Sequence, residues 1–258
     1  MSVKKLMDLS GRVALVTGGS RGLGLQIAEA LGEMGARVAI SARKSDELDH
    51  AIGRLQEQKI TAQAFVADIG KRDAIAPLAE GVLKKFGKVD ILVNNAGATW
   101  GAPAETHPLE AWDKLVNVNL SGAFVLTQLI AVKSMIPAKW GRIINVASIA
   151  GLMGQDPRFA ATAAYTATKH GLVGLTRQLA AEWGVHGITV NAICPGFFPS
   201  KMTKATLDTS GALIKEWTPT RRFGGEEDLK GLAVLLASEA SRHINGQAIA
   251  VDGGATII

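Results

Sequence analysis

Short runs of apolar residues alternate along this chain with longer segments in which apolar residues recur at helical spacing. A short apolar run predicts a buried strand, and the helical spacing predicts an amphipathic helix. Strands are predicted at residues 13–16, 38–40, 64–66, 89–93, 143–146, 188–190 and 248–251. Helices are predicted at about 22–34, 45–58, 71–86, 109–136, 160–184 and 226–237. Thr106 is the expected N-cap of the helix at 109–136, with Pro108 in its first turn.

This alternation predicts the fold class. Strands that alternate with helices are typical of a parallel sheet covered on both faces. We therefore expect an α/β protein with a doubly wound Rossmann fold, in which helices flank both faces of a seven-stranded parallel sheet. The segment 195–222 has no strand pattern and contains Pro195, Gly196, Pro199 and Pro219, so we expect an irregular substrate lid there. No repeat or linker divides the chain, which predicts a single domain over 1–258.

Composition narrows the function classes. Hydrophobic residues make up 47% of the 258 residues, enough for strands buried on both faces. The formal net charge of +5 suits nucleic acid, a membrane surface or a small anion. Because the basic residues do not cluster and no nucleic-acid motif is present, we expect neither nucleic acid nor membrane as a partner. The single cysteine, Cys194, and the lack of a long apolar run favour the cytoplasm. We expect no metal site.

A glycine-rich loop follows the first predicted strand. The residues Thr17-Gly18-Gly19-Ser20-Arg21-Gly22-Leu23-Gly24 open the next helix. Glycines allow a tight turn and a close approach of backbone to a pyrophosphate, and a helix N-terminus offers free N–H groups and a positive dipole end. The order of the glycines differs from G-x-G-x-x-G, and a plain strand-to-helix turn also uses glycine. The position after the first strand favours dinucleotide binding.

The end of the second predicted strand indicates which dinucleotide is bound. NAD-binding proteins usually place an acidic residue there, which accepts a hydrogen bond from the ribose 2′-OH. This chain has Ser41-Ala42-Arg43 instead, and its next acid, Asp46, lies inside the following helix. A guanidinium suits a 2′-phosphate, and Arg21 lies in the neighbouring glycine loop. Either arginine alone is compatible with a solvated surface position, but together they predict NADP(H).

Candidate acid–base residues lie in the helix predicted at 160–184. Tyr165 and Lys169 are four positions apart and therefore share one helix face. A nearby ammonium, together with an oxidised nicotinamide, would lower the pKa of a tyrosine and make it a proton carrier near neutral pH. Tyr-x-x-x-Lys pairs are common by chance, but Tyr165 is the only tyrosine in the chain.

Polar residues also end two of the predicted strands. Ser148 follows the strand at 143–146, and Asn94-Asn95-Ala96-Gly97 follows the one at 89–93. Ligands bind at this edge of open α/β sheets, where the Ser148 hydroxyl could steady a substrate oxygen. A turn serine and a helix cap are the alternatives. Asn119 lies in the middle of a predicted helix, where asparagine is unfavourable, which suggests a structural or water-binding role.

Taken in order, these motifs resemble the short-chain dehydrogenase/reductase family over essentially the whole chain. The matching positions are Thr17-Gly18-x-x-x-Gly22-x-Gly24, Asp68, Asn94-Asn95-Ala96-Gly97, Asn119, Ser148, Tyr165-x-x-x-Lys169, Pro195-Gly196 and Val251-Asp252-Gly253-Gly254. The resemblance implies an oxidoreductase that acts on CH–OH groups with NADP(H). Members of this family are commonly tetrameric, so the resemblance also implies a homotetramer.

The resemblance implies a role for each matching residue. Tyr165 is the expected general acid or base, Lys169 lowers its pKa and holds the nicotinamide ribose, Ser148 positions the substrate oxygen, and Asn119 holds a water of the proton relay. Ser200 is expected near the nicotinamide carboxamide. The residues expected to bind the cofactor are Gly18, Ser20, Arg21, Gly22, Leu23, Gly24, Arg43, Asp68, Ile69, Asn95, Ala96, Gly97, Tyr165, Lys169, Ile193, Pro195, Gly196 and Ser200.

The segments beside the expected pocket bear on the substrate. The spacing from Ser148 to Tyr165 is four residues longer than is usual in the family, and the extra residues fall at 152–162, beside the expected pocket. Walls are expected from 98–100, 152–162 and 197–217, with Phe197, Phe198 and Trp217, unless these residues belong to the core. Pro195-Gly196-x-Phe198-Pro199-Ser200-x-Met202-Thr203 resembles 3-oxoacyl thioester reductases, which we place first. Gluconate 5-dehydrogenases are the alternative, followed by a non-catalytic dinucleotide-binding regulator.

Overall fold

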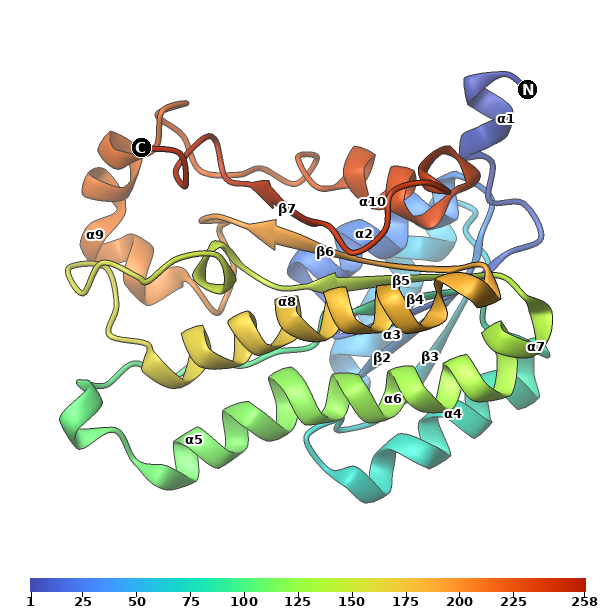
Figure 1. Ribbon diagram of the computed structural model, residues 1–258, viewed down its shortest axis with the longest axis horizontal. Helices are drawn as coiled ribbons and strands as arrows, with labels where there is room; N and C mark the ends of the chain where they lie inside the picture. The colour runs from blue at the N-terminus through green and yellow to red at the C-terminus, as the bar shows by residue number, and fades with distance from the viewer.

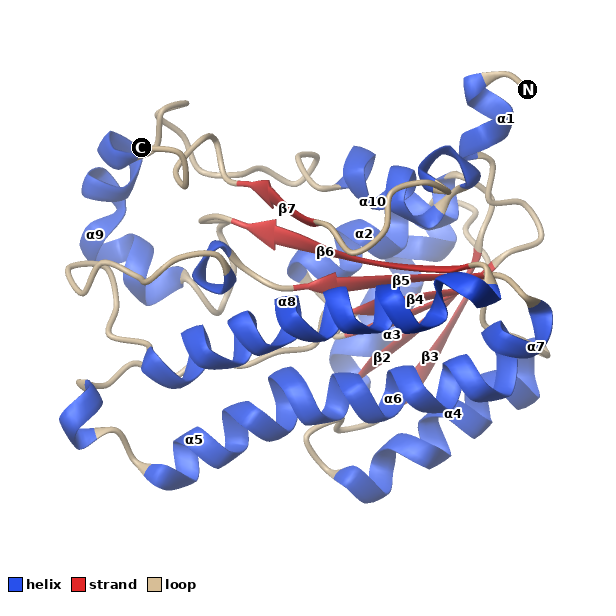
Figure 2. Cartoon of the chain, in the orientation of Figure 1, coloured by secondary structure: helices blue, strands red, loops and turns tan.

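A single sheet organises the computed structural model, which describes residues 1–258. Its seven strands all run parallel, in the order β3-β2-β1-β4-β5-β6-β7 (Figure 2). They are β1 (Val13–Thr17), β2 (Arg37–Ala42), β3 (Ala62–Val66), β4 (Ile91–Asn94), β5 (Gly141–Val146), β6 (Ile188–Pro195) and β7 (Ala248–Val251). The predicted doubly wound α/β fold is confirmed, and each predicted strand overlaps an observed one.

Helices cover both faces of the sheet (Figure 1). One face carries α2 (Gly22–Glu33), α3 (Ser45–Glu57) and α10 (Lys230–Ala237). The other carries α4 (Arg72–Phe86), α5 (Leu109–Val116), α6 (Gly122–Ile130), α7 (Ile136–Ala138) and α8 (Ala163–Trp183). The six predicted helices are all present. Two further helices, α1 (Val3–Met7) and α9 (Lys204–Trp217), have no counterpart in the prediction.

Two local predictions were wrong. The segment 195–222 was expected to be irregular, but it contains α9, which lies beyond the carboxyl ends of β6 and β7 (Figure 1). The prolines do not prevent a helix here, because they lie on either side of residues 204–217 and none lies within them. Thr106 is not the N-cap of α5. It ends a short 3₁₀ turn, Ala104–Thr106, and Pro108 takes the cap position directly before Leu109.

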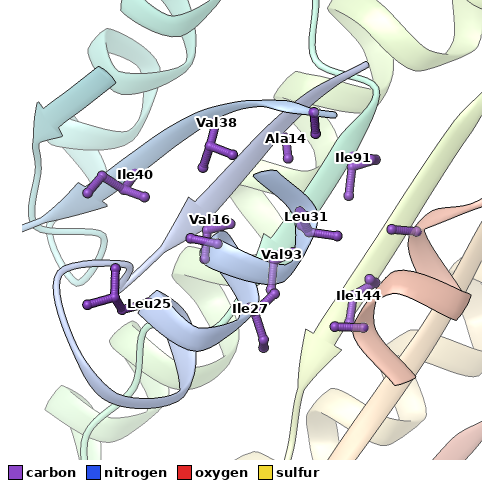
Figure 3. Packing of buried hydrophobic residues seen from close by; sticks show 14 of the residues in the cluster. Ala14, Val16, Leu25, Ile27, Leu31, Val38, Ile40, Ile91, Val93 and Ile144 are labelled. Atoms are coloured by element: carbon purple, nitrogen blue, oxygen red, sulfur yellow. The ribbon is translucent and has the colours of Figure 1, made fainter. Parts of the chain in front are cut away.

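The alternation of side chains along the strands divides the core into two layers. Ala14 and Val16 point from β1 toward the α2 face, whereas Leu15 points toward the α4 and α6 face. Figure 3 shows the first layer, in which α2 places Ile27 and Leu31 against the central strands. All of these side chains are fully buried. Burial on both faces explains why the strands appear in the sequence as continuous apolar runs.

Helices α5, α6 and α7 form one continuous rod, Leu109–Ala138, that is interrupted by two π-helical segments, Asn117–Ser121 and Ala131–Met135. By length and composition alone this rod could cross a membrane, but buried core helices pass the same test. It packs against α4 and α8 as part of the layer on one face of the sheet. The rod is therefore accounted for as a layer of the fold.

The strand order places a crevice beside β1. The chain adds β2 and β3 on one side of β1 and then crosses to β4 on the other side. At such a reversal the connections leave in opposite directions, and ligands bind outside the carboxyl ends of the strands. The glycine loop, Asn94-Asn95-Ala96-Gly97 and Ser148 all follow strands that end at this edge. The fold thus brings together the motifs that are far apart in the sequence.

Candidate active site

A cavity of about 800 Å³ opens at the carboxyl edge of the sheet. Its walls come from the glycine loop, the ends of β2, β4, β5 and β6, the start of α8 and the lid segment before α9. All but one of the residues expected to bind the cofactor line it. These are Gly18, Ser20, Arg21, Gly22, Leu23, Gly24, Arg43, Asp68, Ile69, Asn95, Ala96, Gly97, Tyr165, Lys169, Pro195, Gly196 and Ser200.

Ile193 is the exception, because it does not line the cavity. Its side chain is fully buried in the core layer beneath α2 and α10, and its carbonyl oxygen accepts a hydrogen bond from the Ala147 N–H at 2.8 Å. The alternation along β6 directs this side chain into the core. Ile193 therefore packs in the core beside the site, and its contact with the cofactor stays a prediction.

The glycine loop has a shape that only glycines allow. Gly18 and Gly22 have φ values of +64° and +54°, in the left-handed region. A Cβ at Gly24 would collide with the Gly18 carbonyl oxygen and the Asn95 amide, which itself donates to the carbonyls of Thr17 (2.9 Å) and Gly18 (3.1 Å). Asn95 thereby holds the loop against the end of β4.

The first turn of α2 faces the cavity with free backbone donors. Gly22 begins this helix and lines the cavity, and a Cβ added there would meet only open space. The N-cap residue, Arg21, makes no side-chain hydrogen bond to the helix. The first N–H groups and the positive end of the helix dipole are thus available to an anion. This arrangement fits the pyrophosphate of a dinucleotide.

Charged groups line the end of the cavity next to β2. Arg43 is exposed and extends from the end of β2, and Arg21 approaches from the glycine loop. Arg21 does not point freely into the cavity, because its guanidinium is paired with Glu47 at 2.7 Å. Glu47 is not among the residues predicted from the sequence. The available signal was an acidic residue in the first turn of the helix that follows Arg43.

Tyr165 and Ser148 meet on the opposite wall. Ser148 follows β5 and caps a 3₁₀ turn, Ile149–Gly151, by accepting from the Ala150 N–H at 3.1 Å. Burial raises the pKa of the Tyr165 phenol above its ordinary value, and a hydrogen bond with the Ser148 side chain partly opposes this rise. The phenol is therefore protonated at neutral pH in this structure. Ser148 and Tyr165 line the same cavity.

Lys169 lies one turn further along α8 and is almost completely buried. Its Nζ donates to the Val146 carbonyl at 2.8 Å and lies 5.5 Å from the centre of the Tyr165 ring. Burial lowers the pKa of Lys169 to about 8. Burial is the largest influence on the pKa of Tyr165 here and raises it. The lowering expected from Lys169 together with an oxidised nicotinamide stays a prediction.

Asn119 lies behind this wall and does not itself line the cavity. Its amide oxygen accepts from the Ala98 N–H at 2.8 Å, and its nitrogen donates to the Ala98 carbonyl and the Thr168 hydroxyl, each at 3.0 Å. Asn119 sits in the π-helical segment 117–121, a local widening that is frequent at functional sites. The residue ties the loop after β4 to α8, next to Lys169.

The longer segment between Ser148 and Tyr165 packs on the lid. The ring of Phe159 lies 5.9 Å from that of Phe197, edge to face, and 5.4 Å from that of Trp217. The Ser210 hydroxyl of α9 donates to the Arg158 carbonyl at 3.2 Å. We refer to Phe159, Phe197 and Trp217 as the lid cluster.

Several of the residues expected to form the pocket walls do not line the cavity. The aromatic rings of the lid cluster contact one another and do not line the cavity, and neither does any part of 152–162. Of the expected walls, Ala98 and Phe198 do line it, together with Lys201 and Met202 of the lid. The three aromatic residues thus pack against one another where the lid meets the segment before α8, with Phe159 buried and the other two half-buried. No group of three or more His, Cys, Asp or Glu residues is placed to hold a metal ion.

Known proteins resemble the chain over its whole length. A family profile described as short chain dehydrogenase matches residues 12–211. Gluconate 5-dehydrogenase of Gluconobacter oxydans is 38% identical over 100% of this chain and 99% of its own. The 3-oxoacyl-acyl-carrier-protein reductase of Staphylococcus epidermidis is 38% identical over 93% of this chain and 97% of its own.

A solved structure adds a ligand to this comparison. Gluconate 5-dehydrogenase from Burkholderia cenocepacia, in complex with NADP and tartrate, is 33% identical with a TM-score of 0.93, covering 100% of both chains. The stretch matched by the family profile includes the glycine loop, Ser148, Tyr165 and Lys169. The chain therefore belongs to the short-chain dehydrogenase/reductase family and is an oxidoreductase that acts on CH–OH groups.

Proposed function

We propose that this protein interconverts a ketone and a secondary alcohol with NADP(H), using Tyr165 to carry the proton. The observation that carries this proposal is one continuous cavity. It has the glycine loop and two arginines at one end, and the Ser148 hydroxyl, the Tyr165 phenol and the Lys169 ammonium on its other wall. A dinucleotide that spans this cavity from Arg43 to Tyr165 would bring its reactive ring to the hydroxyl pair.

In the direction of reduction, Ser148 and Tyr165 donate hydrogen bonds to the carbonyl oxygen of the substrate. When bound, NADPH would supply the hydride that is added to the carbonyl carbon. Tyr165 gives its proton to the oxygen as negative charge develops there, and Ser148 stabilises the same charge. Because its raised pKa keeps Tyr165 protonated at neutral pH, the phenol is ready to act as the acid. In oxidation the phenolate takes the proton back.

Lys169 and Asn119 support this proton transfer. The Lys169 ammonium lies on the same helix face as Tyr165 and stabilises the phenolate that remains after transfer. We propose that Lys169 also holds the nicotinamide ribose and that Asn119 holds a water through which the proton is replaced. The π-helical segment at Asn119 supports this role, because it changes the hydrogen bonding of the carbonyl groups in that turn.

NADP(H) is the proposed cofactor because of the charges at the β2 end. Arg43 and Arg21 line that end, and no acidic residue ends β2. The Burkholderia relative was solved with NADP, which agrees with this choice. The residues proposed to hold the pyrophosphate and the adenosine are those of the glycine loop, with Asp68, Ile69 and Asn95 to Gly97.

Replacing Arg43 with aspartate tests the choice of cofactor. The change removes a guanidinium that pairs with a 2′-phosphate and introduces a carboxylate that repels it. We expect the ratio of kcat/KM for NADPH to that for NADH to fall by about two orders of magnitude. Steady-state rates with both cofactors and one ketone substrate measure this ratio, and an unchanged ratio would contradict the assignment.

We propose a small hydroxy acid or sugar acid as the substrate class. Lys201 of the lid and Lys114 of α5 line the cavity and give it a positive charge that suits a carboxylate. The sequence placed a 3-oxoacyl thioester first through the motif from Pro195 to Thr203, but aromatic side chains that would suit an acyl chain contact one another in the lid cluster. Relatives named gluconate 5-dehydrogenase, one of them holding tartrate, support this order. A 3-oxoacyl thioester remains the second candidate, supported by the apolar side chains of Phe198 and Met202 in the cavity.

A substrate panel tests both candidates and the function itself. NADPH oxidation would be followed with 5-keto sugar acids, acetoacetyl thioesters and neutral diketones. The proposal expects measurable turnover with at least one ketone and the highest kcat/KM for a sugar acid. A higher value for the thioesters would favour the second candidate. Binding of NADPH without turnover of any ketone would favour a dinucleotide-binding regulator.

The wider organisation of the protein is also a proposal. We propose that residues 1–258 work as one dinucleotide-binding domain in the cytoplasm, with 195–222 as a lid. We also propose a homotetramer, because the rod formed by α5 to α7 exposes Leu109, Trp112, Phe124 and Val132. Exposed apolar side chains on a packed helix layer are typical of a subunit interface. Light scattering would show four copies of the 27.0 kDa chain.

A further inference from the structure

Glu47 pairs with two cations at the end of the cavity that is proposed to bind the 2′-phosphate. Its carboxylate is paired with the Arg21 guanidinium at 2.7 Å and with the Lys44 ammonium at 3.5 Å. Its second oxygen lies 3.5 Å from the Ser20 hydroxyl. Glu47, Arg21, Lys44 and Ser20 all line the cofactor cavity, so this cluster lies where the dinucleotide is proposed to bind.

The donors gathered around Glu47 are the kind that bind phosphate. A guanidinium, an ammonium and a hydroxyl would each donate to phosphate oxygens, and here all three face one carboxylate. Arg43, which lines the same end of the cavity, makes no side-chain hydrogen bond or ion pair. The carboxylate therefore takes up two of the three cations that a 2′-phosphate could use, and its own charge repels that phosphate.

We propose that Glu47 is a specificity-determining residue that competes with the cofactor's 2′-phosphate for Arg21 and Lys44, and so lowers the preference for NADP(H) over NAD(H). This inference rests on the proposed NADP(H) site. When NADP(H) binds, Arg21 exchanges the carboxylate for the phosphate, and Glu47 must turn away or remain as a repelling neighbour. NAD(H), which has only a hydroxyl there, leaves the Glu47–Arg21 pair intact.

A simpler role for Glu47 would be to stabilise α3, since acidic residues in the first turn favour the helix dipole. Asp46 separates the two roles. It lies in the same first turn and carries the same charge, but it is exposed, makes no contact with Arg21 and does not line the cavity. Asp46→Asn is thus a matched control for the loss of one negative charge near the site.

The test compares Glu47→Gln with Asp46→Asn in the full-length protein. Isothermal titration calorimetry would give dissociation constants for adenosine 2′,5′-bisphosphate and for AMP, two probes that differ only by the 2′-phosphate. The same measurement with NADPH and NADH would follow. We expect Glu47→Gln to tighten binding of the bisphosphate by about tenfold and to leave AMP within about twofold. Asp46→Asn should change both probes by less than about twofold.

The outcomes separate this inference from the proposal on which it rests. If the bisphosphate binds no more tightly than AMP to either the wild type or Glu47→Gln, the NADP(H) site is wrong and the inference fails with it. If the wild type prefers the bisphosphate but Glu47→Gln gains nothing, only the role of Glu47 is wrong. A weaker bisphosphate complex in Glu47→Gln would mean that Glu47 orients Arg21 for the phosphate. An equal gain in Asp46→Asn would mean that general charge alone matters, which also overturns the inference.

Discussion

Replacing Tyr165 with phenylalanine is expected to lower kcat by about three orders of magnitude while the dissociation constant of NADPH changes less than about threefold. The ring still fills its place in the cavity wall, and only the hydroxyl that carries the proton is lost. Single-turnover rates with NADPH and a reducible ketone measure the first effect, and fluorescence titration measures the second. A variant that keeps most of the wild-type rate would exclude Tyr165 as the proton donor.

The ionisation of the Tyr165 phenol can also be observed directly. Because Tyr165 is the only tyrosine, the near-ultraviolet absorbance change on phenolate formation reports this site alone. Burial raises its pKa, so the ligand-free protein should form phenolate only above the pH at which free tyrosine ionises. Adding NADP+ should move this transition to lower pH, since the nicotinamide charge favours the phenolate. Tyr165→Phe provides the blank for the experiment.

Replacing Lys169 with methionine is expected to abolish measurable turnover and yet to stabilise the protein at pH 7. Burial lowers the pKa of Lys169 from 10.5 to about 8, so folding at neutral pH requires a charged group to be held where charge is unfavourable. Removing the charge should gain up to about 3 kcal/mol, and losing the hydrogen bond to Val146 should cost about 1 kcal/mol. We expect a net gain of about 2 kcal/mol, measured by urea unfolding.

The pH dependence of this gain follows from the direction of the shift. Between pH 8 and 10.5 the unfolded chain holds a proton on Lys169 that the folded protein has released, so stability rises with pH over that window. Below pH 8 the full penalty is present. The stability difference between Lys169→Met and the wild type should therefore be largest at pH 7 and should shrink as the pH rises toward 10. A difference that does not vary with pH would mean that Lys169 is not buried as a charged group.

The sequence predicted the sheet well because its strands are buried on both faces. Runs such as Val13–Val16 carry no polar position that would suggest a helix face, so both the element and the parallel topology follow from the pattern. The cavity residues were predicted for a related reason. Loops that follow parallel strands meet at one edge, and the glycines, Ser148 and Asn95 occupy those loops.

What the sequence did not predict depends on contacts between distant segments. Nothing near Phe159 indicates that its partners are Phe197 and Trp217, so these rings were expected to line the pocket. The position of Glu47 against Arg21 depends on how α3 packs beside the glycine loop, which is not a local property. Ile193 was inferred from the family, whereas the alternation along β6 would have placed its side chain in the core.

The lid cluster has a consequence for how such enzymes diversify. Phe159 comes from the segment before α8, whereas Phe197 and Trp217 come from the lid, so neither segment has a complete apolar interior without the other. A chimera that received residues 195–222 from a relative with a shorter connection would lose Phe197 and Trp217 and would leave Phe159 without its partners. Transplanting substrate preference between members of this family thus requires both segments to be exchanged together, as one inherited module.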